Sequence, residues 1–287
     1  MKKLLLLLTL ILTLTGCTYE SPLKEPPAMS IFIGDQQIKV CSGSYHWDYK
    51  KPFGSSTYTI ADGVHPLESN AETYTTAETV ASLRFGAEPQ SVSVECWHED
   101  LRGNTMAKSG YCNLEGNKLS LRSGPYIYAI HASWEGKRYR GSCTSVVCIN
   151  STAKEPILTE PPQLRILCGG KSTIAKLGNY SWRIGDRTDA KTDSLHPLRL
   201  LTAEDQFEME EPYLKLHFDV IPDRIESVAW YDSNLGKEVG GNPINEYWNG
   251  NRLAPYPGGM IIEVHAFWEN RKEYQGDASY CFYIHKE

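Results

Sequence analysis

The chain contains the same block of sequence twice. Ile31 to Trp47 aligns without gaps on Ile166 to Trp182, and three further groups of residues recur at a nearly constant offset. Those groups pair Asp62, His65, Pro66 and Leu67 with Asp193, His196, Pro197 and Leu198; Leu83, Phe85, Pro89, Val92 and Trp97 with Leu216, Phe218, Pro222, Ile225 and Trp230; and His131, Trp134, Tyr139 and Gly141 with His265, Trp268, Tyr274 and Gly276. A repeat of about 120 residues is the size of one small domain. The sequence therefore predicts two domains of one fold, at residues 30–149 and 163–287.

Each copy has the pattern of short strands. Tyr128, Ile130, Ala132 and Trp134 alternate with smaller or polar residues, and Ile262 to Trp268 repeats this period of two. Turn clusters divide each copy into about seven strands. The pattern predicts an all-β chain of two tandem immunoglobulin-like antiparallel β-sandwich domains. Brief helices are expected only at residues 71–81 and 202–210.

The repeated motifs also carry a family resemblance. They read Gly-x-Tyr-x-Trp, then Asp-x-x-His-Pro-Leu, then Pro-x-x-Val/Ile with a Trp, and a closing Tyr-x-Gly. This unit resembles an uncharacterised immunoglobulin-like module of exported Gram-positive bacterial proteins. The resemblance implies a surface-exposed β module and no particular activity.

The first residues have the composition of an export signal. Lys2 and Lys3 precede an apolar run from Leu4 to Leu14, whose length as a helix, ~16 Å, is about half of a bilayer core. The next residues complete Leu14-Thr15-Gly16-Cys17, which matches the lipobox of bacterial lipoproteins. The resemblance implies a signal peptide at residues 1–16 and acyl chains on Cys17 that anchor the chain outside the cytoplasm in the cell membrane.

The net charge of the whole chain and the prolines outside the repeats give two further expectations. The chain has 29 Lys and Arg against 35 Asp and Glu, a net charge of -6, which argues against a partner that is a nucleic acid. Prolines mark residues 17–29 as an extended tether and residues 150–162 as a stiff linker. The membrane is therefore expected to be contacted through the lipid and not through a basic surface.

Seven cysteines remain after Cys17, and an oxidising exterior favours pairing of some of them. Cys168 and Cys281 lie in the first and last strands of the second copy, which can be neighbours in this fold class, so either a disulfide or two buried thiols are expected there. Cys96 with Cys112 is the best pairing in the first copy. Cys143 and Cys148 lie about 16 Å apart on one strand and cannot bridge.

The tryptophans give the main candidates for binding. Trp47, Trp134, Trp182 and Trp268 are expected in the cores. By contrast, Trp97 and Trp230 are out of phase with the inward residues of their strands, so they are the candidate binding residues, for a sugar ring or a protein partner. The alternative is that a loop or the neighbouring domain covers them.

No catalytic residue, metal site or cofactor is expected. The duplicated pairs Asp62/His65 and Asp193/His196 have the residue types of a general base, but an Asp that caps a turn, with the His packed beside a rigid Pro, explains them more simply. His131 and His265 face away from the core. Gly170-Lys171-Ser172 lacks the leading glycine of a phosphate-binding loop, and no Cys or His spacing suits zinc.

These features predict a non-enzymatic, lipid-anchored surface protein that binds a cell-envelope component, either a glycan or a protein. Two alternatives stay open. One is a hydrolase that uses a duplicated Asp/His pair, and the other is a structural spacer or sensor ectodomain.

Overall fold

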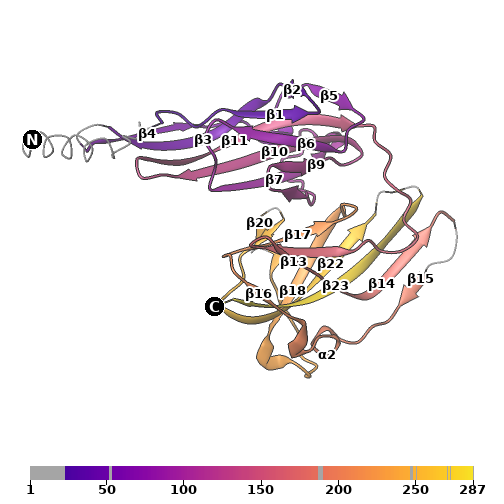
Figure 1. Ribbon diagram of the computed structural model, residues 1–287. Coiled ribbons are helices and arrows are strands. Elements are labelled where there is room, and N and C mark those ends of the chain that lie inside the picture. Colours follow the sequence, from indigo (N-terminus) through magenta and orange to yellow (C-terminus); the bar gives the residue numbers. More distant parts are fainter. Residues whose placement is uncertain are drawn as a thin grey trace, which may run out of the picture.

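The computed structural model describes residues 23–51, 54–186, 190–245, 248–249, 251–269, 271 and 273–286 (Figure 1). In these ranges the strands form four sheets, and every helix is a short segment of three or four residues. The all-β prediction is therefore confirmed. None of the helices in this part of the chain has the length and hydrophobicity needed to cross a bilayer.

The first repeat, from Met29 to Ser151, consists of two sheets. One has the order β2 (Gln36–Ile38), β1 (Met29–Ile33), β6 (Val80–Phe85), β9 (Lys118–Ser120) and β8 (Leu114–Glu115). The other has the order β4 (Ser56–Ala61), β3 (Cys41–Lys50), β11 (Tyr139–Ser151), β10 (Gly124–Glu135) and β7 (Ser91–His98), with β5 (Thr73–Thr76) paired to β11. The 3-10 turns η1 (Pro66–Glu68) and η2 (Glu99–Leu101) follow β4 and β7.

The second repeat, from Leu164 to Lys286, has the same strand order with one additional strand at the edge of its second sheet. Its first sheet is β13 (Lys171–Ile174), β12 (Leu164–Cys168), β17 (Leu214–Phe218), β21 (Arg252–Leu253) and β20 (Trp248–Asn249). Its second sheet is β15 (Ala190–Thr192), β14 (Lys176–Ile184), β23 (Tyr274–Lys286), β22 (Gly258–Trp268), β18 (Arg224–Tyr231) and β19 (Asn242–Pro243), with β16 (Gln206–Met209) paired to β23. The short helices are α2 (Pro197–Leu200), η3 (Ala203–Asp205) and η4 (Asp232–Asn234). The duplication seen in the sequence is thus repeated in the topology.

The expected helices at residues 71–81 and 202–210 are largely strands. β5 and β16 lie there, and each pairs in parallel with the last strand of its repeat, β11 or β23. Residues 73–76 read Thr-Tyr-Thr-Thr, and β-branched and aromatic side chains favour strands over helices. Only the turn Ala203–Asp205 remains helical in the second copy.

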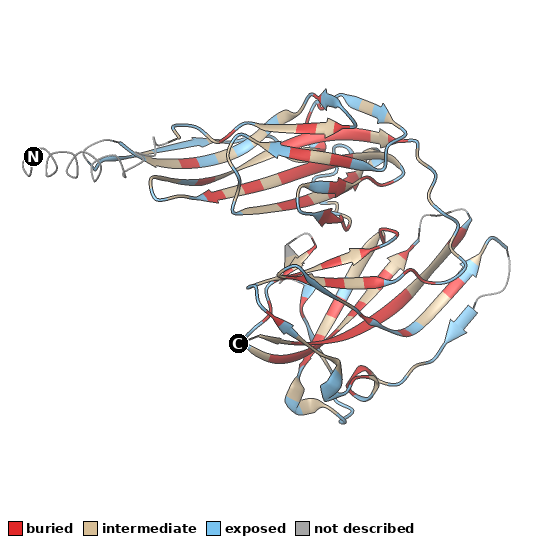
Figure 2. Ribbon diagram, in the orientation of Figure 1, coloured by how far each residue is buried: buried red, intermediate tan, exposed pale blue. Residues whose placement is uncertain are grey.

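Each repeat buries its core between its two sheets, and the buried residues form stripes along the central strands (Figure 2). The four tryptophans expected in the cores are there, because Trp47, Trp134, Trp182 and Trp268 are at most 3% exposed. Gly141 explains the closing Tyr-x-Gly motif, since a Cβ atom there would lie 2.2 Å from the carbonyl oxygen of His46. The same holds for Gly276 and the carbonyl of Ser181, at 2.3 Å.

The segment before each repeat packs on the repeat that follows. Trp47 Nε1 donates a hydrogen bond to the Leu23 carbonyl at 2.9 Å, and Trp182 Nε1 donates to the Leu158 carbonyl at 3.1 Å. The linker predicted at residues 150–162 is therefore tied to the second repeat at Leu158. Pro162, at its end, accepts a further hydrogen bond from the Tyr280 hydroxyl at 2.6 Å.

The two repeats are joined by direct contacts as well as by the linker. Tyr111 of the first repeat is only 5% exposed and belongs to the core of the second, where its ring lies edge-on to Phe218 at 5.4 Å. Asn113 Nδ2 donates to the Phe218 carbonyl at 2.6 Å. Asn251 Nδ2 returns a contact to the Leu114 carbonyl at 3.2 Å. Side chains of both repeats thus satisfy main-chain groups of the other.

A buried ion network closes this interface. Arg122, 3% exposed, pairs with Asp223 of the second repeat at 2.5 Å, and Arg271 contacts the other oxygen of the same carboxylate. Arg271 also reaches Glu155 of the linker at 3.1 Å. Burial alone would raise the pKa of Asp223, but Arg271 and Arg122 hold it below its ordinary value. These buried charges compensate one another across the interface, and they therefore fix the orientation of the two repeats.

Candidate functional site

Trp97 and Trp230 are not exposed on a sheet face, so the expectation that their rings are open to a ligand is wrong. Each is 5% exposed. The chain that follows each strand folds back over the indole, and Nε1 donates to the Ala107 carbonyl at 3.0 Å in the first repeat and to the Val239 carbonyl at 2.8 Å in the second. The alternative that a loop covers them is the observed one.

The duplicated histidines are part of the same cover. His65 lies edge-on to Trp97 at 5.8 Å, and His196 lies edge-on to Trp230 at 5.5 Å. The Nδ1 atom of His65 accepts a hydrogen bond from the Leu67 amide at 3.2 Å, and His196 does the same for Leu198 at 3.3 Å. These imidazoles cap the turns η1 and α2, which accounts for their recurrence.

The predicted disulfides are absent, since all seven described cysteines are free thiols. Cys168 faces the core between the sheets of the second repeat, whereas Cys281 packs beside Trp230 on the other face of its sheet. Because the two side chains lie on opposite faces of the β23 sheet, they do not meet and form no bridge. Cys96 and Cys112 do share one core. The predicted lipidation site, Cys17, lies outside the described residues.

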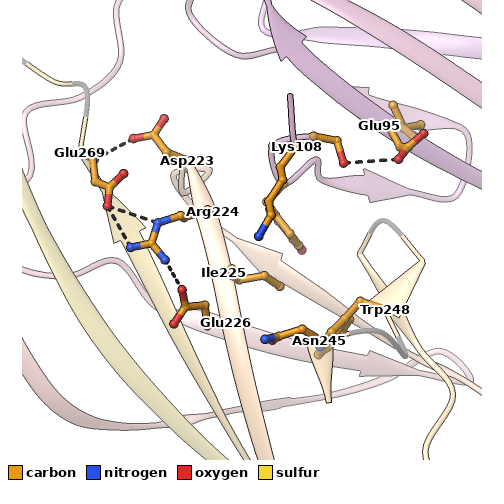
Figure 3. A pocket seen from close by; sticks show the side chains of 13 residues that line it. Glu95, Lys108, Asp223, Arg224, Ile225, Glu226, Asn245, Trp248 and Glu269 are labelled. Atoms are coloured by element: carbon orange, nitrogen blue, oxygen red, sulfur yellow. Dashed lines mark hydrogen bonds and ion pairs between the residues drawn. The ribbon is translucent and has the colours of Figure 1, made fainter. Parts of the chain in front are cut away.

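A cleft of about 560 Å³ lies between the two repeats (Figure 3). Its wall on the first repeat is formed by β7 and the loop that follows, with Glu95, Lys108 and Ser109. Its wall on the second repeat is formed by β18, with Arg224, Ile225 and Glu226. The volume is in the ~300–1,000 Å³ range typical of ligand sites.

Most of the charged side chains in the cleft are paired with each other. Arg224 lies between two carboxylates, with Glu226 at 2.5 Å and Glu269 at 3.1 Å, and Figure 3 shows this row along one wall. Glu95 accepts a hydrogen bond from the Ser109 hydroxyl at 3.3 Å. Lys108 projects into the cleft and forms no ion pair among the described residues. The cleft therefore presents many hydrogen-bonding groups with little unpaired charge.

Trp248 and Asn245 form the lower rim of the cleft in Figure 3. The indole Nε1 of Trp248 donates to the Ser227 hydroxyl at 2.7 Å, and Asn245 Oδ1 accepts from the Ser227 amide at 2.6 Å. Both side chains are thereby held in place by the edge of β18. Trp248 is half-buried, so part of its ring surface borders the cleft.

A second hollow, of about 720 Å³, adjoins the cleft and shares Glu95, Lys108 and Ser109 with it. His131 lies there with its Nε2 3.0 Å from Glu95 Oε2 and its Nδ1 3.0 Å from the Thr144 hydroxyl. The hydrogen bond from His131 lowers the pKa of Glu95. The structure thus connects a carboxylate, an imidazole and a hydroxyl by hydrogen bonds. They belong to Glu95, His131 and Thr144, and not to the Asp62/His65 pair.

Sequence comparison of the two copies missed this site because the site is not repeated. Lys108 and Trp248 lie in segments where the copies do not match, and Glu95 corresponds to Val228 in the second copy. Two signals were present in the sequence: Trp248, the tryptophan without a counterpart, and His131, which recurs as His265. Among the described residues no group of His, Cys, Asp and Glu is arranged to hold a metal ion.

Comparison of the chain with protein-family models, with curated proteins and with solved structures finds no match.

Proposed function

We propose that the protein is a non-enzymatic binding protein of the cell envelope. Its acyl chains on Cys17 hold it on the outer side of the cell membrane, and its two repeats are immunoglobulin-like modules. The ligand is a glycan of the envelope, bound in the cleft between the repeats. The cleft, built from both repeats, is the observation that carries this proposal.

The chemistry of the cleft favours a polar ligand with many hydroxyl groups. Paired ions such as Arg224 with Glu226 keep lone pairs and N–H groups for further hydrogen bonds without demanding a counter-charge. The Trp248 ring offers an apolar face beside them. Sugars present hydroxyl groups at their edges and C–H groups on their faces, so both surfaces are used.

The rigid interface supports the same proposal. Ordering of a flexible pair of domains opposes binding, whereas a cleft fixed by the Arg122–Asp223 pair is preorganised. This replaces the idea of two equivalent sites at Trp97 and Trp230. In this proposal the two repeats each contribute one wall to a single binding site, the cleft.

The test measures capture of the full chain, in detergent, by immobilised envelope polysaccharide. Trp248→Ala and Glu226→Gln are expected to weaken capture about tenfold or more. Tyr58→Ala, an aromatic that is 61% exposed on β4, is the matched control and is expected to leave capture unchanged. Equal capture of all four proteins would remove the cleft from the account, and capture only by envelope protein would replace the glycan by a polypeptide partner.

A hydrolase is the second candidate, and it now rests on Glu95, His131 and Thr144. In the tautomer protonated on Nε2, His131 donates to Glu95 and accepts from the Thr144 hydroxyl, the relation of a general base to a nucleophile. Release of reducing sugar or acid from envelope material, abolished by both His131→Ala and Thr144→Val, would establish it. Release that persists in Thr144→Val would exclude this nucleophile.

A further inference from the structure

Two cations lie opposite each other on the first sheet of the second repeat, on the face that points away from the core. Lys215 of β17 and Arg252 of β21 are directly opposite in the antiparallel ladder. Their neighbours Leu214 and Leu253 are buried in the core, so Lys215 and Arg252 share the other face of the sheet. Like charges at directly opposite positions of a ladder are destabilising.

Neither Lys215 nor Arg252 forms an ion pair with a described residue. Glu211 and Glu115 act on the charge of Lys215 only from a greater distance. The guanidinium of Arg252 instead stacks on the Tyr213 ring at 3.8 Å and donates to the Val92 carbonyl of the first repeat at 3.4 Å. Burial, together with the charge of Arg252, lowers the pKa of Lys215. The two charges are therefore held together and partly desolvated.

The carboxylates nearby contact other cations or none. Glu115 lies 3.8 Å from His217, Glu210 bonds Lys171 at 2.5 Å, and Asp219 pairs with Arg165 at 3.4 Å. Glu211 borders the same surface but is not within ion-pair distance of Lys215. Glu88 also lines the hollow beside Arg252, so carboxylates and cations are balanced around it, but neither Lys215 nor Arg252 has a carboxylate at ion-pair distance among the described residues.

Open space adjoins both cations. Hollows of about 410 and 320 Å³ share Gly116, Glu211, Tyr213 and Lys215, and Arg252 lines the second. Neither hollow shares a residue with the cleft between the repeats. The turn Gly169–Gly170 and Ser172 border the first hollow, but Lys171 beside them is already bonded to Glu210.

We propose that Lys215 and Arg252 form an anion-binding site, separate from the cleft, for a phosphate or carboxylate group. One anion between the two side chains converts their repulsion into two charge-assisted hydrogen bonds. Arg252 is preorganised for this by Tyr213 and by Val92, so the site exists only while the two repeats are docked. The ligand is a free anion or an anionic group on a larger envelope molecule.

The test titrates the full chain, in detergent at constant ionic strength, with inorganic phosphate, dimethyl phosphate and acetate, by calorimetry and by thermal unfolding. At least one of these probes is expected to bind saturably, with affinity reduced tenfold or more in both Lys215→Gln and Arg252→Gln. Lys118→Gln, the same change at an exposed lysine of β9, is the control and is expected to bind like the wild type. Binding of dimethyl phosphate indicates a phosphodiester, and binding of inorganic phosphate or acetate alone indicates a free anion or a carboxylate.

A second measurement needs no ligand. Without added anion, Lys215→Gln is expected to raise Tm, because it removes the repulsion, whereas Lys118→Gln is not. Absence of saturable binding by all three probes would overturn the proposal, as would equal binding by the wild type and both site variants. Neither result bears on the proposed binding of a glycan in the cleft, because the two sites share no residue.

Discussion

The Tyr111 hydroxyl of the first repeat donates a hydrogen bond to the Leu216 carbonyl of the second at 2.6 Å, inside the second core. The two residues are 105 positions apart in sequence. Burial raises the pKa of Tyr111 well above its ordinary value, so the hydroxyl keeps its proton at any physiological pH. The second repeat therefore completes its core with a side chain of the first, and we expect the two to unfold in one transition.

Asp223→Asn is expected to destabilise the protein by about 3–5 kcal/mol, because it leaves Arg122 and Arg271 buried without their shared counter-charge. The free energy of unfolding by denaturant gives the value. Asp219→Asn is the control, since its pair with Arg165 is exposed and should contribute about 0–1 kcal/mol. Similar losses in the two variants would show that the network does not hold the interface.

Acid should weaken the same network. The folded-state pKa of Asp223 lies below its unfolded value of about 3.9, so its contribution is complete above that pH and is lost as the pH falls through the folded-state pKa. The stability gap between the wild type and Asp223→Asn should then shrink below about pH 4. A gap that stays constant from pH 7 to pH 3 would contradict this assignment.

Trp97→Ala and Trp230→Ala are expected to reduce the stability of the protein and not to remove a contact with a ligand. Each indole is buried and hydrogen-bonded, so truncation should lower the free energy of unfolding by about 3–5 kcal/mol. Thermal unfolding followed by tryptophan fluorescence measures this. Variants as stable as the wild type would mean that the covering loops are open in solution.

Cys17→Ser is expected to release the protein from membranes into the soluble fraction, because the proposed anchor is the acylated thiol. Fractionation of cells with detection of the chain tests this. A substitution at Cys143, a free thiol of β11, is the control and should leave the chain in the membrane fraction.

The duplicated strands were readable from the sequence because alternation and repetition agree on them. The face of Trp97 was also read correctly, since it points away from Val94, which lies in the core. What covers that face was not readable, because residues 99–107 are irregular and have no periodicity. An outward side chain on a strand is exposed only if no loop returns over it.

The cleft was beyond the reach of the sequence for a related reason. Its walls meet because Tyr111, Asn113 and Arg122 complement main-chain and carboxylate groups of the other repeat, more than 100 positions away. Such complementarity depends on three-dimensional placement and leaves no local pattern. Comparing the copies directed attention to what they share, whereas Lys108 and Trp248 of the candidate site have no counterpart in the other copy.

The hydrogen bond between Trp47 and the Leu23 carbonyl limits how far the first repeat can lie from the proposed lipid anchor. Only six residues lead from Cys17 to Leu23, and they can extend over no more than about 22 Å at ~3.6 Å each. With its lipid in the bilayer, the first repeat would stand within one small-protein diameter of the headgroups. With that anchor, the end of the first repeat that holds Leu23 would therefore lie next to the membrane surface.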